Sequence, residues 1–241
     1  MKWHYRGTQD MNIALIIAGG RGMRMGQEIP KQFLTVYDKP VIAYTLEAFE
    51  KHPDVDAIAV VCVEGWDSIL SAYARQYHIT KLKHIFPGGE NGQASIRNGV
   101  FGLEKLYGPE DIVLIHDAIR PMVSQDIISG CIATAREHGS AIVTIPCQEA
   151  MLETDDQRTT HAAYPRENLK RTQTPQGFPI GTLCDAHRLA LERGITNSVA
   201  SCTLMVELGR TVWFCAGSEK NIKLTTPDDL EIFKALLQMR G

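Results

Sequence analysis

Residues 13–26 read IALIIAGGRGMRMG, an apolar run that passes directly into a turn rich in glycine and arginine. The apolar run is short and aliphatic, which is typical of a strand in a parallel sheet. The glycines after it let the backbone approach a ligand closely and point N–H groups at anionic oxygens, and the arginines add positive charge. The stretch therefore predicts a strand that ends in a polyphosphate-binding loop.

The rest of the chain repeats an alternation of short apolar runs and longer segments of helical period. This order is typical of strand–helix–strand units that build a mostly parallel sheet, so we predict an α/β fold. The expected strands are 12–18, 55–63, 82–86, 112–116, 140–146 and 211–216. The expected helices are 40–51, 66–77, 93–106, 125–138, 181–193 and 227–239.

Two segments fall outside the alternation. Residues 1–10 are polar and precede Met11, a second methionine directly before the first strand. We expect them to be an N-terminal extension or tag, and residues 11–241 to form a single domain. Residues 147–169 contain two short extended candidates separated by ETDDQR at 153–158, which predicts a protruding β-hairpin arm. Because two strands alone are marginal in water, the arm is expected to pack on a second copy and make a homodimer.

Composition restricts the class of protein. With 25 basic and 28 acidic residues the net charge is −3, so the protein has no overall positive charge that would attract a nucleic-acid backbone. A polyanionic ligand would therefore have to be bound by cations close to it. The six cysteines form no Cys-x-x-Cys pair, which argues against disulfides and zinc and favours a reducing, cytoplasmic location. The start lacks an apolar signal stretch, and nowhere do about 18 apolar residues run together, so we expect neither export nor a membrane span.

A glycine-rich turn after a strand also occurs in two other classes of protein. The dinucleotide fingerprint needs its last glycine where this chain has Arg24 and Met25, and the P-loop needs Gly-Lys-Ser/Thr, which is missing. The glycine-rich turn by itself is also compatible with a tight strand-to-helix turn that binds no ligand. Beyond it, Pro30 stiffens the chain just before Lys31, which can reach back over the turn. This additional cation favours a phosphate-binding loop.

Five blocks, in order along nearly the whole chain, resemble the signature of the sugar-phosphate and polyol-phosphate nucleotidyltransferases. They are AGGRGMRM at 18–25 with PKQFL at 30–34, GG at 88–89 with Ser95, HDAIRP at 116–121, QTPQGF at 173–178 and NIKLTTPDDL at 221–230. Within that group the chain is most similar to the cytidylyltransferases acting on 2-C-methyl-D-erythritol 4-phosphate and on ribitol 5-phosphate. The resemblance implies a three-layer Rossmann-like fold and an enzyme that joins CTP to a small polyol phosphate, releasing pyrophosphate.

The resemblance also implies roles for individual residues. An acceptor phosphate attacks the α-phosphorus of CTP, so the site must hold two anions together and neutralise charge that builds on phosphorus. Arg24, Lys31 and Lys223 are implied as catalytic, and Lys223 also as a contact of the acceptor. The implied nucleotide-binding positions are Ala18, Gly19, Gly20, Gly22, Gly88, Gly89 and Ser95. Each cation could instead be an ordinary solvated side chain, and Ser95 an ordinary polar residue at a helix start.

Asp117 follows an apolar strand, at the sheet edge where α/β proteins bind ligands. A carboxylate there suits Mg²⁺, which takes one or two carboxylates and completes its shell with phosphate oxygens and water. Asp117 could otherwise be a helix or turn cap, and His116 beside it is expected to be a packed core histidine. The resemblance places Arg120 at the acceptor phosphate. It places Arg166, on the arm, at the acceptor of the neighbouring subunit, although mere surface exposure explains Arg166 equally well.

Four positions depart from the pattern of the methylerythritol enzymes, mainly on the acceptor side. An Asp-Thr pair whose threonine contacts the acceptor phosphate is Glu149-Ala150 here, and a Thr-Asp-Asp-Ala motif falls on ASCT at 200–203. Gly92 replaces an arginine, and Ile119 an alanine. Losing a donor to a bound phosphate costs about 1 to 3 kcal/mol. We therefore favour an acceptor like ribitol 5-phosphate, with another polyol or sugar phosphate as the alternative, although the ribitol enzymes also keep an Asp-Thr pair.

Other functions stay open on the sequence alone. The glycine-rich loop contacts only the phosphates of a nucleotide, so UTP, GTP or ATP could replace CTP. Methylerythritol phosphate remains an alternative acceptor. The changes at Gly92, Ala150 and Ala200 also suit a non-catalytic homologue that senses a nucleotide. A nicotinamide-dependent dehydrogenase is disfavoured, because the glycine spacing is wrong and the ribose-binding acid is missing.

Overall fold

The computed structural model describes residues 10–20 and 29–239. Its central sheet has seven strands in the order β11-β7-β10-β6-β1-β4-β5. The strands are β1 (Asn12–Ala18), β4 (Ala57–Cys62), β5 (Leu82–Pro87), β6 (Ile112–Asp117), β7 (Ala141–Pro146), β10 (Lys170–Pro179) and β11 (Phe214–Ala216). Only β10 is antiparallel to its sheet neighbours, and all other neighbouring pairs are parallel. The prediction of a mostly parallel α/β sheet is confirmed.

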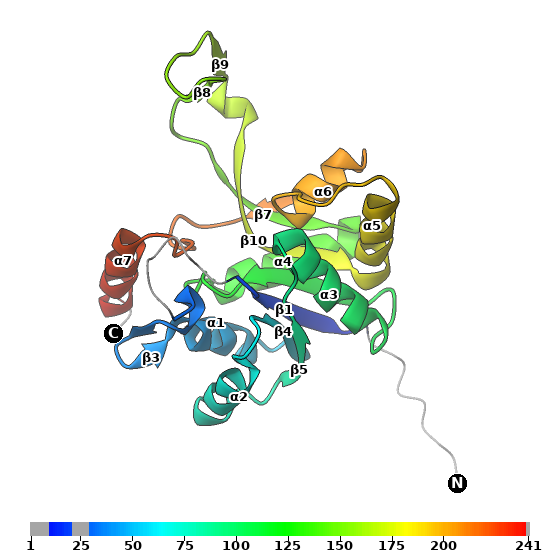
Figure 1. The fold of residues 1–241 in the computed structure, drawn as a ribbon, viewed down its shortest axis with the longest axis vertical. Coiled ribbons are helices and arrows are strands. Elements are labelled where there is room, and N and C mark those ends of the chain that lie inside the picture. Colours follow the sequence, from blue (N-terminus) through cyan, green and yellow to red (C-terminus); the bar gives the residue numbers. More distant parts are fainter. Residues whose placement is uncertain (1–9, 21–28, 240–241) are drawn as a thin grey trace.

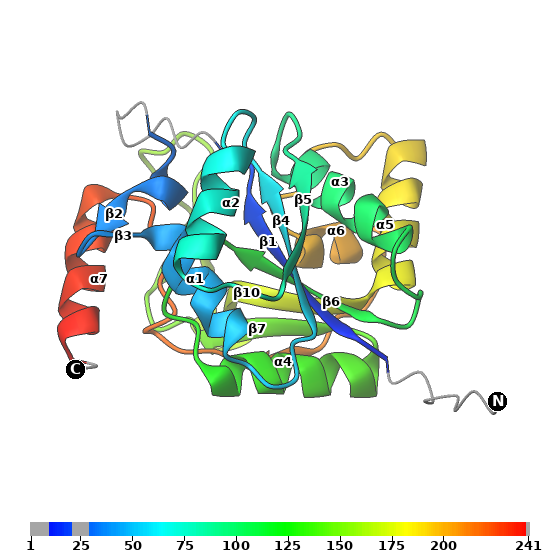
Figure 2. The same cartoon turned by 90° about the horizontal axis from the view of Figure 1, so that it is seen from below.

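Helices cover both faces of the sheet, which gives three layers (Figure 2). The helices are α1 (Val41–Glu50), α2 (Asp67–Gln76), α3 (Gly92–Glu104), α4 (Gln125–His138), α5 (Ile180–Glu192) and α6 (Ser201–Glu207). Alternate residues of β1 point to opposite faces. Ala14 and Ile16 pack with α1, α2 and α4, whereas Ile13 and Leu15 pack with α3, α5 and α6. The two cores thus share one buried strand, and that strand carries the glycine turn.

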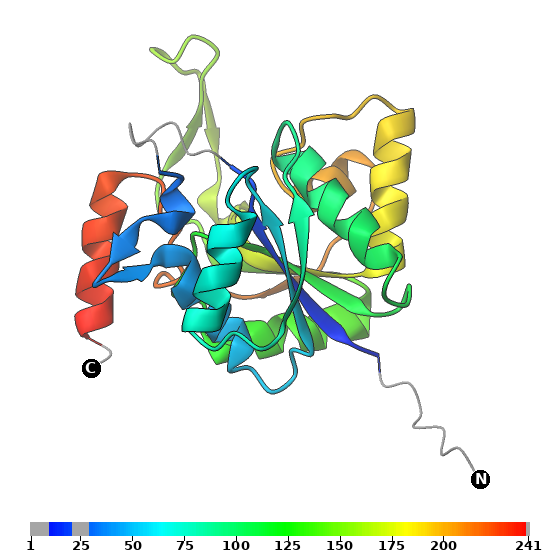
Figure 3. The ribbon, with the colours of Figure 1, turned by 60° about the horizontal axis from the view of Figure 1, so that its bottom comes forward.

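A small third core lies beside this sandwich (Figure 3). It joins α7 (Pro227–Gln238) to β2 (Thr35–Val36) and β3 (Lys39–Pro40). Phe233 of α7 is fully buried and meets the Tyr44 ring edge-on, with 5.2 Å between ring centroids. The third core therefore holds the C-terminal segment against the start of the chain's first helix.

The segment 147–169 forms the expected hairpin arm, which projects away from the body (Figure 1). β8 (Met151–Glu153) pairs antiparallel with β9 (Ala162–Tyr164), and the short helix η3 (Arg166–Asn168) follows. Three large apolar side chains on it, Met151, Leu152 and Tyr164, are each 44 to 59% exposed. Packing of the arm on a second copy stays a prediction.

The sequence patterns missed β10 and α6 and overestimated some strand lengths. The expected strand 211–216 is reduced to Phe214–Ala216. β10 contains Pro175 and Gly177, residues that usually interrupt strands, so its pattern reads as a loop. α6 has Ala200 at its N-cap, where a Ser, Thr, Asp or Asn would mark a start. Among the described residues, no helix is both long and apolar enough to cross a bilayer.

Candidate active site

The carboxyl ends of β1 and β6 lie side by side, with Ile17 opposite Asp117 in the register. β1 leads on to β4 on one side of the pair, and β6 leads on to β7 on the other. Ligands of open α/β sheets bind in the crevice at such a reversal of strand order. The glycine turn and the strand aspartate therefore meet where this fold class places its ligands.

A cavity of about 660 Å³ opens at this crevice. Predicted site residues from five separate parts of the chain line it: Ala18, Gly19, Gly20, Lys31, Gly89, Ser95, Asp117 and Lys223. Gly88 lies directly behind Gly19 rather than in the cavity wall. Gly22 and Arg24, also predicted for this site, lie outside the described residues. We call this space the nucleotide cavity.

The glycines at the back of the nucleotide cavity pack too closely for side chains. A Cβ added to Gly19 would lie 2.9 Å from Ser95 Oγ and 3.3 Å from the Cα of Gly88. Ser95, itself buried, accepts a hydrogen bond of 3.0 Å from the Gly89 N–H. The N-terminus of α3 is capped by Asn91 instead, whose side chain accepts from the Ala94 N–H. Ser95 thus holds the Gly88-Gly89 pair next to Gly19.

Gly19→Ala is expected to lower the free energy of unfolding by about 1 to 3 kcal/mol, because a tightly packed site must move to admit the methyl group. Gly20→Ala is the matched control, since no atom of the described residues, its chain neighbour aside, lies within 4 Å of its added Cβ. That control should change stability by less than about 1 kcal/mol. Urea unfolding of the two variants measures the difference, and equal destabilisation would contradict the close packing.

Lys31 reaches the cavity from η2 (Lys31–Phe33), a short helix held at both ends. Gln32 is buried and donates to the carbonyls of Ala18 and Gly20, at 2.7 and 3.0 Å. The Phe33 ring stacks on Trp66 with 4.6 Å between ring centroids. Gln32 was missed as a site residue, although it stands inside the block PKQFL. Its amide ties the segment carrying Lys31 to the start of the glycine turn.

Asp117 joins two cations at the floor of the site. Its Oδ2 lies 3.1 Å from Lys223 Nζ and 3.1 Å from Arg120 Nε. Burial raises the pKa of the Asp117 carboxyl, but Lys223 and Arg120 outweigh burial and hold that pKa below its ordinary value of 3.8. Asp117 is therefore a carboxylate at neutral pH. Within the described chain no hydrogen bond or ion pair reaches its other oxygen, Oδ1.

A buried chain of hydrogen bonds holds Asp117 in place from behind. Its N–H donates to Thr174 Oγ1 at 3.0 Å, and that hydroxyl lies 3.1 Å from His116 Nδ1. His116 Nε2 lies 3.1 Å from the Arg120 carbonyl, which can only accept, so Nε2 carries the proton. Burial lowers the pKa of His116 to about 4, so the ring is neutral. His116 is a packed histidine, as expected, and Thr174 is a supporting residue that sequence reasoning missed.

The segment that carries Lys223 is fixed to the strand aspartate at several points. Arg120 donates to the carbonyl of Asn221 at 2.8 Å, and the Leu224 N–H donates to the Ile119 carbonyl at 2.9 Å. Just beyond, the Thr226 hydroxyl accepts from the Asp229 N–H and so caps α7. Lys223 therefore reaches the site from a backbone that is anchored on both sides.

A second cavity, of about 320 Å³, adjoins the first. The two share Asp117, Lys223, Gly92 and Ile17 in their walls. The second is further lined by Arg120, Thr172, Thr174, Val199, Ala200 and Ser201. We call it the acceptor cavity, because it holds the predicted acceptor residue Arg120. Any ligands in the two cavities would meet at the Asp117–Lys223 pair.

Arg166 lies elsewhere. It stands on η3 of the arm, is exposed, and donates to the carbonyl of Gln148 at 2.8 Å. It lines neither cavity of its own chain. The structure therefore separates Arg166 from the other predicted site residues, and its role in a neighbouring subunit stays a prediction.

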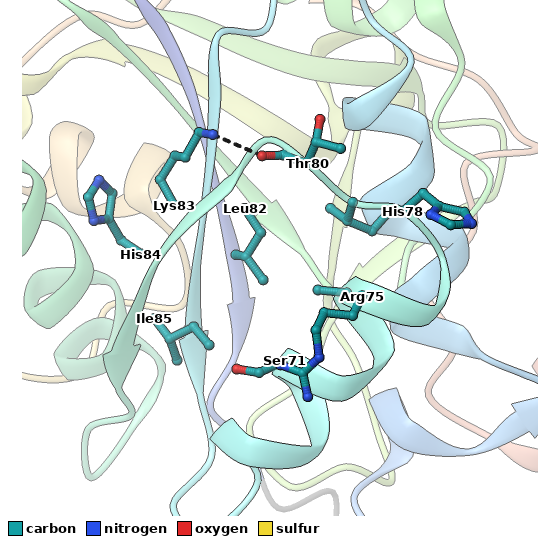
Figure 4. A pocket seen from close by; sticks show the side chains of 10 residues that line it. Ser71, Arg75, His78, Thr80, Leu82, Lys83, His84 and Ile85 are labelled. Carbon is teal, nitrogen blue, oxygen red and sulfur yellow. Dashed lines mark hydrogen bonds between the residues drawn. The ribbon is translucent and has the colours of Figure 1, made fainter.

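Another hollow, of about 480 Å³, lies between α2 and the edge strand β5 (Figure 4). Its cationic side chains are Arg75 and Lys83, and Lys83 Nζ donates to the carbonyl of Thr80 at 2.9 Å. It follows the first half of β5 rather than the carboxyl ends of the strands, and no carboxylate among the described side chains lines it. It is therefore the weaker candidate for a phosphate and metal site.

Comparisons with known proteins agree with this geometry. The family model described as 2-C-methyl-D-erythritol 4-phosphate cytidylyltransferase matches residues 12–239. The chain is 44% identical to "Ribitol-5-phosphate cytidylyltransferase" of Lacticaseibacillus paracasei, over 95% of this chain and 98% of that protein. It is 35% identical to "2-C-methyl-D-erythritol 4-phosphate cytidylyltransferase" of Desulforamulus reducens, over 95% and 97%.

A solved structure extends the likeness to the fold. The crystal structure of a 4-diphosphocytidyl-2C-methyl-D-erythritol synthase superposes with a TM-score of 0.80 at 27% identity, covering 96% of this chain and all of that one. The match covers nearly the whole chain, and helices lie on both faces of this sheet, so the three-layer prediction is confirmed. The protein is an enzyme of the nucleotidyltransferase class, and the chain belongs to the 2-C-methyl-D-erythritol 4-phosphate cytidylyltransferase family.

Proposed function

We propose that the protein transfers CMP from CTP to ribitol 5-phosphate, giving a CDP-polyol and pyrophosphate. One observation carries the proposal: two adjoining cavities share the Asp117–Lys223 pair, and each is also lined by groups that are able to bind a phosphate. Glycine N–H groups and Lys31 suit a triphosphate on one side. Arg120 suits a phosphate monoester on the other. Two anions held this way have their reacting atoms next to one ammonium group.

The choice of acceptor rests on two further observations. The more similar of the two relatives above bears the ribitol name, at 44% against 35% identity. Ala200 lines the acceptor cavity at the position where the methylerythritol enzymes have a threonine hydroxyl. Ala150, the other lost hydroxyl, stands exposed at the base of the arm. Methylerythritol phosphate would therefore lack the donor expected at position 200, whereas the donor lost at Ala150 is missing relative to the ribitol enzymes as well.

The catalytic contribution of the chain is positioning and charge neutralisation, as in other transfers at phosphorus. The glycine turn and Lys31 would hold the triphosphate so that pyrophosphate can leave. Arg120 would orient the acceptor phosphate, and Lys223 would lie between that phosphate and the α-phosphorus. Asp117 keeps both cations in place through its ion pairs, at 3.1 Å each.

The donor set at Asp117 fits Mg²⁺. Among residues 10–20 and 29–239, no three His, Cys, Asp or Glu side chains come together as a metal site. A cation would therefore depend on one carboxylate, through Oδ1 of Asp117, and on phosphate oxygens, which is the pattern that Mg²⁺ takes with nucleotides. Bound there, Mg²⁺ would withdraw charge from the triphosphate as a Lewis acid.

The proposal includes a homodimer in the cytoplasm. Met151, Leu152 and Tyr164 expose apolar surface on a two-stranded arm that is marginal alone. Pairing of two arms would cover that surface and bring Arg166 to the partner's acceptor cavity. Light scattering should give twice the mass of the chain, and a monomer would remove the role of Arg166.

Pyrophosphate release tests the function directly. The assay combines CTP, UTP, GTP or ATP with a series of four- to six-carbon polyol phosphates. We expect the highest kcat/KM for CTP with ribitol 5-phosphate. Faster turnover with methylerythritol phosphate would overturn the choice of acceptor, and preference for another nucleotide would overturn CTP. No release with any acceptor would identify a non-catalytic homologue.

A further inference from the structure

The hydroxyl of Ser201 is buried, and nothing in the described part of the chain bonds to it. The residue is 3% exposed, and among residues 10–20 and 29–239 its Oγ has no hydrogen-bond partner. Buried polar side-chain atoms nearly always have one, and leaving one unsatisfied destabilises a protein. Ser201 also lines the acceptor cavity. The hydroxyl itself has almost no exposed surface, so it must turn about the Cα–Cβ bond toward the cavity before a ligand there can supply the missing partner.

The backbone around Ser201 is held on both sides, which fixes the point from which its hydroxyl turns. The Cys202 N–H donates to Oε1 of the buried Gln176 at 2.9 Å. On the other side, Thr203 Oγ1 accepts from the Ala200 N–H at 2.8 Å. Because the backbone is ordered before binding, only one side-chain rotation has to be fixed when the hydroxyl meets its partner.

The surroundings of Ser201 suit a carbon chain with hydroxyl groups. Ile96 and Ile115 provide apolar wall, and Thr172 adds a second hydroxyl. The cations of the acceptor cavity, Arg120 and Lys223, both pair with Asp117. A phosphate held by those cations leaves the rest of the acceptor for the part of the cavity lined by serine, threonine and isoleucine.

We propose that Ser201 is a specificity-determining residue, whose Oγ hydrogen-bonds one hydroxyl of the acceptor's carbon chain. This inference rests on the proposed transfer to a polyol phosphate and deepens it. A site built to bond a hydroxyl rejects an analogue that lacks it, because its buried polar group is then left unpaired. Ser201 would thus favour an unbranched polyol phosphate over a methyl-branched one with fewer hydroxyls.

The test combines Ser201→Ala with ribitol 5-phosphates that each lack one hydroxyl. For Ser201→Ala we expect KM for ribitol 5-phosphate to rise about tenfold, with KM for CTP unchanged. One deoxy analogue should show the same rise on the wild type and no further rise on Ser201→Ala, because both changes remove the same bond. Ser198→Ala is the matched control, since the Ser198 hydroxyl already bonds Glu207 within the chain.

Several results would overturn the inference. One is an unchanged KM for ribitol 5-phosphate in Ser201→Ala. Another is a further rise in KM of the same size with every deoxy analogue on Ser201→Ala. A third is an effect of Ser198→Ala on acceptor preference equal to that of Ser201→Ala. Wild-type enzyme that accepts every deoxy analogue equally well would also overturn it, without need of any variant. A wild type that prefers another polyol phosphate contradicts the proposed acceptor instead, and the same comparison with deoxy forms of that polyol then decides the role of Ser201.

Discussion

Lys31→Ala is expected to lower kcat for pyrophosphate release by about a hundred- to a thousandfold, the usual effect of removing one group that stabilises charge in a transition state. Lys31 lies in the wall of the nucleotide cavity, on a helix tied to the glycine turn through Gln32. Alanine removes the charge and leaves that anchoring amide untouched. The protein should therefore stay folded while turnover falls.

The matched control for Lys31 is Lys83→Ala, which removes a lysine from the hollow beside β5. It should leave kcat and KM for CTP within about twofold of the wild type, since surface substitutions away from a site have small effects. Steady-state kinetics of the two variants gives the comparison. Full activity of Lys31→Ala, or an equal loss in Lys83→Ala, would contradict the placement of the triphosphate.

Asp117→Asn is expected to lower kcat by about a hundredfold or more and to weaken the response to Mg²⁺. The amide has nearly the shape of the carboxylate but no charge, so Lys223 and Arg120 lose the ion pairs that position them. The proposed metal ligand is lost at the same time. Measuring kcat against Mg²⁺ concentration should show a higher requirement for the metal than in the wild type.

Asp126→Asn serves as the control for Asp117. Asp126 lies in the first turn of α4, is exposed, and lines neither cavity. Its loss should leave turnover and the Mg²⁺ response unchanged, although it removes a favourable charge at a helix start. An Asp117→Asn enzyme with wild-type turnover would show that the shared floor of the two cavities is only structural.

The elements that the sequence predicted well are those with a strong local pattern. β1, with alternate side chains in two cores, passes directly into glycines, and this order alone pointed to the edge where the nucleotide cavity opens. Asp117 was predicted for the same reason, because a carboxylate after an apolar strand ends up at the carboxyl edge of the sheet. Backbone periodicity therefore locates the site.

The parts that could not be predicted depend on contacts between distant segments. Gln32 acts through the carbonyls of the glycine turn, and Thr174 through His116, 58 positions away in the chain. Ser201 reaches the acceptor cavity on α6, a helix without a cap signal in the sequence. No local pattern reveals such contacts, since a polar residue in a loop looks the same whether it supports a site or faces water.

The central claim is that the glycine turn, Lys31 and Asp117 converge on one triphosphate. A crystal structure of the protein with CTP and Mg²⁺ tests it most directly. The account predicts phosphate oxygens against the N–H groups of Gly19 and Gly20 and beside Lys31, with the cation on Asp117 and the α-phosphorus facing the acceptor cavity. A nucleotide bound elsewhere, for example in the hollow beside β5, would contradict it.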